Sequence, residues 1–275
     1  MRSKQPRVFD AETRSDPDFP YLTLEDRFPF PDADESSGSV VAVGGNLSPG
    51  MIVSAYVQGI FPWFNEDDPI YWQSPNPRFV VFPETFHVPK RLDRSMRKSP
   101  FTIRTDTQFE RVIGHCSGVA REGQNGSWIT DDMIDAYVEL HRSGIAHSVE
   151  AWMDGDLVGG FYGLLLGKVF FGESMFTRVS DASKTAFAVF ARRFFGTMGG
   201  MMIDSQVYTD HIARFGGVNV SRSVYLRRLR ECLGISPEAW IGGDHADSCD
   251  ASDEATREAS DFPFARGLWR PDYLY

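Results

Sequence analysis

Two short segments of the chain carry polar side chains inside apolar runs. In VFFGESMF, Glu173 stands among phenylalanine and methionine residues, and in MMIDSQ, Asp204 and Gln206 follow two methionines and an isoleucine. A carboxylate among apolar neighbours costs free energy unless it is paired or bound to a partner. Both segments are therefore candidates for a functional site.

The period of two in a β-strand decides which of these side chains share a face. It places Val169, Phe171, Glu173 and Met175 on one face of the first segment. Two explanations stay open for Glu173. It forms a structural pair with a nearby Arg or Lys, or it receives a cationic group of a substrate.

The second segment places Asp204 and Gln206 side by side, with alpha carbons about 7 Å apart. A carboxylate next to an amide can hydrogen-bond to it, which orients the Gln carbonyl and leaves it polarised. A structural polar contact is one explanation and catalytic work is the other. Catalysis is favoured because two adjacent polar groups on one face of a core strand are rarely there for packing.

A cluster of cations follows Pro89, which suits the start of a helix. On a helical wheel five basic side chains fall within an arc of about 120°, with Leu92 and Met96 opposite. They are Lys90, Arg91, Arg94, Arg97 and Lys98. Such a stripe is typical of a phosphate-binding surface, and a merely solvated basic face is the alternative.

Aromatic side chains near proline and glycine could stack on an unpaired base. Trp63 lies in IFPWF, Tyr71 and Trp72 precede a proline-rich loop, and Trp128 lies in GSWIT. Packing in the core or in a turn is the alternative for each of them.

The elements that must position these residues predict an α+β fold. Residues 19–79 predict a small α/β domain with the strand VVAV and a helix that starts after Ser48 and ends at Gly59. The three prolines of YWQSPNPRFVVFP break regular structure and indicate a domain boundary near Pro77–Phe82.

Residues 80–239 predict a larger domain built on a meander. Thr130 suits the start of a helix, and HSVEAWM, DLVGGFYGLLL and VFFGESMF follow as three antiparallel strands joined by glycine turns. Ser180 or Asp181 then caps the helix ASKTAFAVFARRFFG, which crosses the sheet to the strand MMIDSQ, and two short helices follow. This order matches the N-acetyltransferase-like (GNAT) fold.

The usual ligand of that fold is acetyl-coenzyme A, whose pyrophosphate is held by a glycine-rich turn before the crossing helix. The corresponding segment here, RVSDASKT, has no glycine. Pyrophosphate binding at this helix start is therefore not expected, and another acyl donor is. A coenzyme A-dependent acetyltransferase is kept as an alternative.

Composition limits the remaining classes. The 275 residues are 42% hydrophobic, and no run of about 18 apolar residues could span a membrane. The start of the chain has no apolar secretion signal, so a cytoplasmic protein is expected. The three cysteines and six histidines show no ligand spacing, so neither a metal nor a redox site is expected.

The net charge of −10 is concentrated at the two ends. Residues 1–35 hold nine acids and five bases, and residues 244–275 hold eight acids and three bases, which leaves −1 for the part between. A nearly neutral body can still present a local basic face to a polyanion. Residues 1–18 predict an irregular arm, and residues 240–275 predict an acidic tail with an aromatic end.

Taken in order, these motifs resemble those of the bacterial leucyl/phenylalanyl-tRNA–protein transferases. The resemblance rests, from about Val40 to Leu233, on VAVGGNLSP, GIFPWF, YWQSPNPR, the basic helix, SWIT, AHSVEAW, LVGGFYG, FFGESMF, ASKTAF and MMIDSQ. The family implies transfer of Leu or Phe, less readily Met, from charged tRNA to the α-amino group of proteins that begin with Arg or Lys. That transfer marks the acceptors for the N-degron pathway. The aminoacyl ester supplies the energy, so the family implies no metal, ATP or coenzyme A.

The family also implies roles for residues at matching positions. Asp204 and Gln206 match its catalytic pair, and Glu173 matches a carboxylate that receives the cationic acceptor. Trp72 and Trp128 match aromatics that hold the terminal adenosine. The pocket for the transferred side chain is matched by Phe161, Met175, Phe187 and Phe190. The basic helix is expected to contact tRNA phosphates, and a monomer is expected. A tRNA-binding protein without transferase activity is the second alternative.

Overall fold

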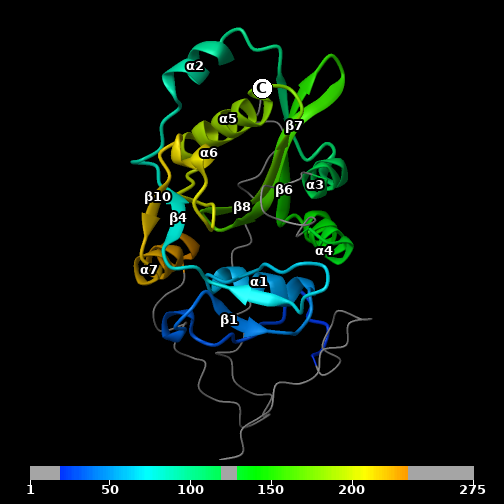
Figure 1. The fold of residues 1–275 in the computed structure, drawn as a ribbon, viewed down its shortest axis with the longest axis vertical. Coiled ribbons are helices and arrows are strands. Elements are labelled where there is room, and N and C mark those ends of the chain that lie inside the picture. The colour runs from blue at the N-terminus through cyan, green and yellow to red at the C-terminus, as the bar shows by residue number, and fades with distance from the viewer. Residues whose placement is uncertain (1–18, 119–128, 235–275) are drawn as a thin grey trace, which may run out of the picture.

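The computed structural model of the protein describes residues 19–118 and 129–234. The chain forms an α+β structure with a small three-stranded sheet near its N-terminus and a seven-stranded sheet (Figure 1). The expected arm at 1–18, the expected tail at 240–275 and Trp128 lie outside the described residues. None of the helices in the described ranges is long and apolar enough to cross a membrane.

Between residues 19 and 77, the N-terminal part contains one α-helix, one 3-10 helix and three strands in the order β1-β3-β2. Their bounds are η1 Ala33–Glu35, β1 Val40–Val43, α1 Pro49–Val57, β2 Phe61–Pro62 and β3 Tyr71–Gln73. The expected strand VVAV and the helix after Ser48 are both confirmed. Gly59 follows the helix with a φ of 77°, a conformation that costs a glycine little.

The seven-stranded sheet has the order β10-β4-β9-β8-β7-β6-β5. Its strands are β4 Arg78–Val81, β5 Thr102–Thr105, β6 Ala146–Met153, β7 Asp156–Leu166, β8 Val169–Thr177, β9 Met202–Asp204 and β10 Val218–Val220. Strands β8 and β9 pair in parallel, and the other neighbours pair antiparallel. The meander β6-β7-β8, the crossing helix and the parallel strand β9 confirm the expected topology.

Helices cover both faces of this sheet (Figure 1). Helix α5, Ala182–Gly196, packs on β6, β7 and β8, with α2, Lys90–Met96, and α6, Asp210–Ala213, on the same side. The opposite face is covered by α3 Phe109–Ser117, α4 Asp131–Arg142 and α7 Arg222–Leu233.

The two expected helix starts differ in how they are capped. The Thr130 hydroxyl accepts a hydrogen bond from the backbone N–H of Met133 at 3.3 Å, as a capping residue should. Asp181 precedes α5 in a left-handed conformation and makes no capping hydrogen bond with its side chain. Its carboxylate instead pairs with Lys184 at 2.9 Å.

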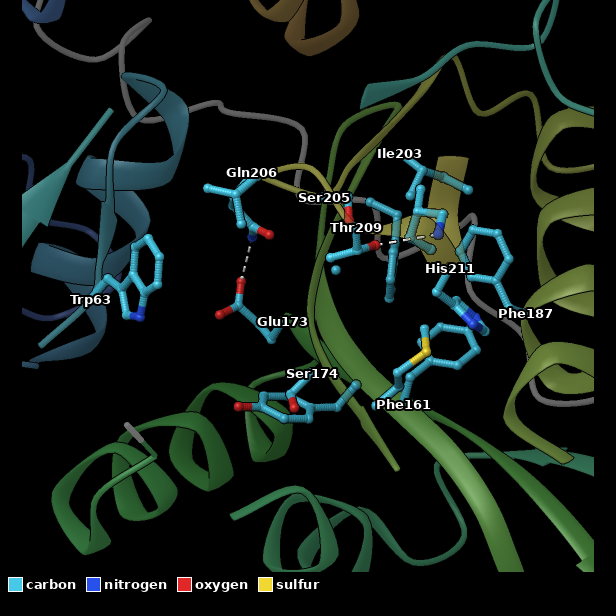
Figure 2. Close-up of a pocket in the computed structure, with 16 residues that line it drawn as sticks. Trp63, Phe161, Glu173, Ser174, Phe187, Ile203, Ser205, Gln206, Thr209 and His211 are labelled. Carbon is cyan, nitrogen blue, oxygen red and sulfur yellow. Dashed lines mark hydrogen bonds between the residues drawn. The ribbon is translucent and has the colours of Figure 1, made fainter. Parts of the chain in front are cut away.

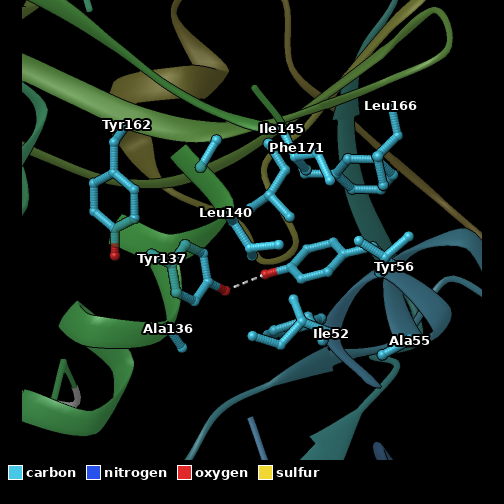
Figure 3. Close-up of a cluster of buried hydrophobic side chains, with 14 of the residues drawn as sticks. Ile52, Ala55, Tyr56, Ala136, Tyr137, Leu140, Ile145, Tyr162, Leu166 and Phe171 are labelled. Carbon is cyan, nitrogen blue, oxygen red and sulfur yellow. Dashed lines mark hydrogen bonds between the residues drawn. The ribbon is translucent and has the colours of Figure 1, made fainter. Parts of the chain in front are cut away.

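The expected domain boundary near Pro77–Phe82 falls inside the larger sheet. Strand β4 pairs with both β9 and β10, so a division between residues 79 and 80 cuts through a strand. Every residue of α1 is buried, and its Tyr56 ring packs edge to face on Phe171 of β8 at 5.1 Å (Figure 3). One hydrophobic core therefore joins the small sheet to the larger one.

Candidate active site

A cavity of about 370 Å³ lies where β8 and the chain after β9 separate (Figure 2). Pairing between the two strands ends at Phe171 opposite Asp204. Residues 172–175 of β8 and residues 205–207 after β9 line the cavity. The cavity therefore occupies the place where these parallel strands stop pairing.

A β-bulge sets the direction of Glu173. Tyr162 and Gly163 of β7 lie opposite Ser174 and Gly172 of β8, so Glu173 has no partner on β7. A bulge of this kind inserts one extra residue into a strand and re-aims the side chains that follow.

The bulge makes the expected face pattern of this strand wrong. Phe171 lies in the core shared with α1 and α4, whereas Met175 packs on the side of α5 with Phe161 and Phe187. A strict period of two would place Phe171 and Met175 on one face. The extra residue at Glu173 puts them on opposite faces of the sheet.

The Glu173 carboxylate accepts three hydrogen bonds. The Tyr56 hydroxyl donates to Oε1 at 2.7 Å, the Tyr137 hydroxyl to Oε2 at 3.2 Å, and the Gln206 side-chain amide to Oε1 at 3.1 Å. Burial raises the pKa of Glu173 to about 7, although both tyrosine hydroxyls act to lower it. Within the described ranges Glu173 forms no ion pair with an Arg or Lys, so the structural pair considered for it is not formed there.

The two tyrosines and Glu173 form a closed ring of hydrogen bonds. The Tyr56 and Tyr137 hydroxyl oxygens lie 2.7 Å apart, and each also contacts the carboxylate. These three oxygen–oxygen contacts need three protons, whereas two hydroxyls supply two. When Glu173 is protonated on Oε2, that proton supplies the third: Oε2 then donates to Tyr137, Tyr137 donates to Tyr56, and Tyr56 donates to Oε1. This agrees with the raised pKa of Glu173.

Gln206 lies just after β9 and has a left-handed backbone, with a φ of 56°. Its backbone N–H donates to Oδ1 of Asp204 at 2.9 Å, and its side-chain nitrogen donates to Glu173. These bonds hold both ends of the residue and direct its amide oxygen toward the cavity (Figure 2). In the described part of the chain no donor reaches that oxygen.

Asp204 is fully buried and does not line the cavity. Arg78 donates to its two oxygens at 2.9 and 2.7 Å, and the Tyr225 hydroxyl donates at 2.7 Å. The expectation that Asp204 orients the Gln206 amide is wrong in this structure, because the left-handed turn carries that amide away from the strand face. The Asp204 carboxylate holds the backbone of Gln206, and Glu173 holds the amide.

The deep part of the cavity is apolar. Phe161, Met175 and Phe187 line it, and the rings of Phe161 and Phe187 pack edge to face at 5.9 Å. Phe190 does not line the cavity but packs behind Phe161, with ring centres 5.5 Å apart. Three of the four residues expected at the pocket therefore meet in one cavity, and Phe190 supports its wall.

The position of Trp72 does not agree with the stacking role expected for it. Its side chain is 1% exposed, because β3 turns it into the core against Phe30, with ring centres 5.0 Å apart. Its Nε1 donates to the carbonyl oxygen of Gly44 at 2.8 Å. Neither face of this ring is open to a base.

Trp63, unlike Trp72, lines the cavity. It is half-buried and lies across the opening from Glu173 and Gln206 (Figure 2). Sequence reasoning named Trp63 as a possible stacking residue but did not place it in the site.

The five basic side chains at α2 are all exposed. The helix ends at Met96, with Arg97 as its C-terminal cap and Lys98 beyond it. The row of basic side chains on the helix is therefore shorter than the helical wheel predicts. Asp93 lies among these cations and pairs with Arg192 at 2.5 Å and with Arg97 at 3.5 Å.

Four residues that hold the site together were not assigned to it from the sequence: Tyr56, Arg78, Tyr137 and Tyr225. Arg78 opens the apolar strand RFVV, and a buried Arg there requires a partner. A buried Tyr likewise needs a partner for its hydroxyl, although nothing in the sequence says which one. In the described ranges no three His, Cys, Asp or Glu side chains are grouped so that they could hold a metal ion.

Family models match both parts of the chain. The model described as leucyl/phenylalanyl-tRNA protein transferase matches residues 80–230, and the model of that family's N-terminal domain matches residues 45–76. The leucyl/phenylalanyl-tRNA–protein transferase of Myxococcus xanthus is 52% identical over 222 residues, which cover 80% of this chain and 94% of the relative. That of Nitrosospira multiformis is 48% identical over 224 residues, which cover 80% of this chain and 96% of the relative.

Among solved structures, a GCN5-related N-acetyltransferase from Kribbella flavida is 15% identical, with a TM-score of 0.33, and the match covers 63% of this chain and 62% of that one.

The matches to curated relatives define the class of the protein, which is an aminoacyltransferase. The chain belongs to the leucyl/phenylalanyl-tRNA–protein transferase family. The family that the sequence motifs resemble is thereby confirmed.

Proposed function

We propose that this enzyme moves leucine or phenylalanine, and less readily methionine, from charged tRNA to the α-amino group of proteins that begin with arginine or lysine. The observation that supports this most directly is the 3.1 Å hydrogen bond between Glu173 and Gln206 beside the apolar cavity. One cavity thus combines an apolar wall for a transferred side chain with a carboxylate for a cation.

The apolar wall is the proposed site for the transferred side chain. Phe161, Met175 and Phe187 offer it shape and apolar contact. A pocket of this kind discriminates by only about 1–3 kcal/mol per methylene, so leucine, phenylalanine and methionine can all be accepted. Trp63 at the opening is the proposed stacking surface for the terminal adenosine, in place of the buried Trp72.

Glu173 is the proposed binding residue for the cationic side chain of the acceptor. With a pKa of about 7 the empty site holds its proton part of the time. A bound Arg or Lys side chain favours the ionised carboxylate and lowers this pKa, so the proton leaves when the acceptor binds. A neutral or acidic side chain at the start of the acceptor would not stabilise the ionised carboxylate in this way.

Gln206 is the proposed catalytic residue. Its amide oxygen would accept a hydrogen bond from the attacking α-amino group and hold the nitrogen over the ester carbonyl. The nitrogen lone pair forms the new bond to the carbonyl carbon, the ester bond to the tRNA 3′-terminal ribose oxygen breaks, and that oxygen gains the proton that the nitrogen loses. Asp204 is a positioning residue in this scheme, because it holds the backbone of Gln206 from the buried side.

The remaining parts of the proposal concern partners and location. The exposed cations at α2 would bind tRNA phosphates, and acceptors modified in this way would enter the N-degron pathway. The enzyme would act as a monomer in the cytoplasm. The ester supplies the energy, so no ATP, metal or coenzyme A enters the scheme.

A transfer assay tests the proposal. The full-length protein would receive labelled Leu-, Phe- and Met-tRNA together with peptides that begin with Arg, Lys or Asp. We expect transfer of all three amino acids to the Arg and Lys peptides and none to the Asp peptide. Equal transfer to the Asp peptide, or none from Leu- and Phe-tRNA, would overturn the proposal. Tight binding of charged tRNA without transfer would instead favour a non-catalytic tRNA-binding protein.

A further inference from the structure

His211 separates two cavities. It lies in α6 and lines both the 370 Å³ cavity of the proposed active site and a second cavity of about 300 Å³. No other residue in ranges 19–118 and 129–234 lines both of them. The imidazole ring is therefore the wall that the two cavities share.

The two cavities differ in the charge of their linings. The first has an apolar deep end, where Figure 2 shows His211 beside Phe161 and Phe187. The second has four charged side chains in its lining, namely Arg91, Asp181, Lys184 and Arg214, beside Pro89, Leu92, Ser180 and Phe215. One ring thus separates the apolar end of the first cavity from three cations and a carboxylate in the second.

The His211 ring is suited to end an apolar pocket because it is neutral. Burial, together with the nearby charges of Lys184 and Arg214, lowers its pKa to about 4. Its Nε2 is buried, and no hydrogen-bond partner reaches it in the described part of the chain. The Phe215 ring packs beside it with centres 5.7 Å apart. A charged ring in this place would cost free energy.

We propose that His211 sets the depth of the pocket for the transferred side chain and so excludes side chains larger than phenylalanine. This rests on the proposed function, since it takes the first cavity as the aminoacyl pocket. An indole would have to displace the His211 ring, which Phe215 packs against, while Phe215 itself packs on Phe187 at 4.8 Å. Removal of the ring would join the two cavities and give the indole room.

The test compares tryptophan with phenylalanine, both carried on the same tRNA and transferred to one Arg-starting peptide. In His211→Ala we expect the ratio of tryptophan to phenylalanine transfer to rise at least about tenfold over wild type, because a change of one methylene in an apolar pocket alters discrimination by about 10- to 200-fold. Leucine transfer should stay within about threefold of wild type, since its shorter side chain need not reach the wall.

Leu92→Ala is the matched control. Leu92 lines the second cavity and not the first, so trimming it enlarges the second cavity without opening the shared wall, and the ratio should not change. Should His211→Ala fail to fold, His211→Asn is expected to raise the ratio by a smaller factor. A second measurement needs no variant and uses the wild-type protein alone. In it, tryptophanyl-adenosine should inhibit phenylalanine transfer at least about tenfold more weakly than phenylalanyl-adenosine.

An unchanged ratio in His211→Ala would overturn the proposal, as would an equal rise in Leu92→Ala or equal inhibition by the two adenosines. Each of these results leaves wild-type phenylalanine transfer intact. Failure of wild type to transfer leucine or phenylalanine at all would instead refute the proposed function.

Discussion

At the scale of single residues, the bond between Gln206 and Glu173 joins the proposed catalytic amide to the proposed acceptor site. The amide has one nitrogen and one oxygen, and Glu173 uses the nitrogen. The oxygen is therefore the end left for an incoming amine. Asp204 contributes from the buried side by fixing the left-handed backbone on which this orientation depends.

Loss of the Gln206 amide should slow transfer without unfolding the protein. Gln206→Ala removes one hydrogen bond made to the reacting nitrogen, and the loss of one such bond costs about 100-fold or more in kcat. Single-turnover transfer from Phe-tRNA measures this, with the melting temperature as a check on folding. Gln206→Asn, which tolerates a left-handed backbone, serves as the milder variant. A rate for Gln206→Ala within about threefold of wild type would remove Gln206 from the mechanism.

The raised pKa of Glu173 should make the stability of the fold depend on pH. The folded carboxyl keeps its proton up to about pH 7, whereas the unfolded one loses it near the ordinary value of 4.5. This contribution is complete below the unfolded pKa and is lost as the pH rises through the folded pKa. Glu173→Gln keeps the shape without the titration.

The melting temperature of Glu173→Gln should therefore match that of wild type near pH 5 and exceed it by about 3 °C or more at pH 8. Thermal unfolding over a pH series measures the difference. A difference that stays the same from pH 5 to pH 8 would show that Glu173 has an ordinary pKa.

The polar residues of the site could be predicted from the sequence, but their partners could not. Glu173, Asp204 and Gln206 stand out because each interrupts an apolar run. The partner of Asp204 is Arg78, 126 residues away, and only the pairing of β4 with β9 brings them together. The left-handed backbone of Gln206 could not be predicted either, because this conformation is uncommon for residues other than glycine.

At the scale of elements, the bulge in β8 shows that a strict period of two does not predict the face of every side chain in a strand. The meander was predictable because its strands are long and its turns contain glycine. The extra residue at Glu173 depends on how β7 and β8 cross, which alternation within one strand does not report. Strand β4 escaped prediction because it directly follows the prolines that indicated a boundary.

Gly163 should be required for this crossing of β7 and β8. A Cβ on Gly163 would overlap the carbonyl oxygen of Phe171, so Gly163→Ala must shift one strand against the other. We expect transfer to fall about tenfold or more, because a shift of about 1 Å at a site can cost about 100-fold in rate.

Gly114→Ala is the control for Gly163→Ala. Gly114 lies in α3, and a Cβ there would meet no atom within 4 Å. This change should leave transfer unaltered and stabilise the helix by about 0.5–1 kcal/mol. Normal transfer by Gly163→Ala would mean that the bulge does not position Glu173.

At the scale of the whole molecule, the basic surface and the small sheet lie at opposite ends. Figure 1 places α2 at one end of the larger domain and β1 beyond the other end, with strand β8 of the cavity between them. The proposed tRNA contact at α2 thus lies apart from the opening beside Trp63. Charge at α2 should then affect tRNA binding without altering the recognition of acceptors.

The affinity for charged tRNA should fall steeply with salt because cations at α2 displace counterions from phosphates. Removal of one such cation, as in Arg94→Ala, should reduce the slope of log affinity against log salt by about 0.7–0.9. Filter binding between low and physiological salt measures the slope. Arg142→Ala, an exposed cation in α4, which Figure 1 places far from α2, should leave it unchanged. Equal slopes for wild type and Arg94→Ala would exclude a phosphate contact at this residue.

The most direct test of the central claim compares phenylalanine transfer to two peptides that begin with arginine or with citrulline, which has nearly the same shape but no charge. If Glu173 receives the cation, wild type should prefer arginine by at least about tenfold in kcat/KM, because an unpaired buried charge is costly. Glu173→Gln should reduce that preference to less than about threefold. The same arginine preference in both proteins would contradict the account.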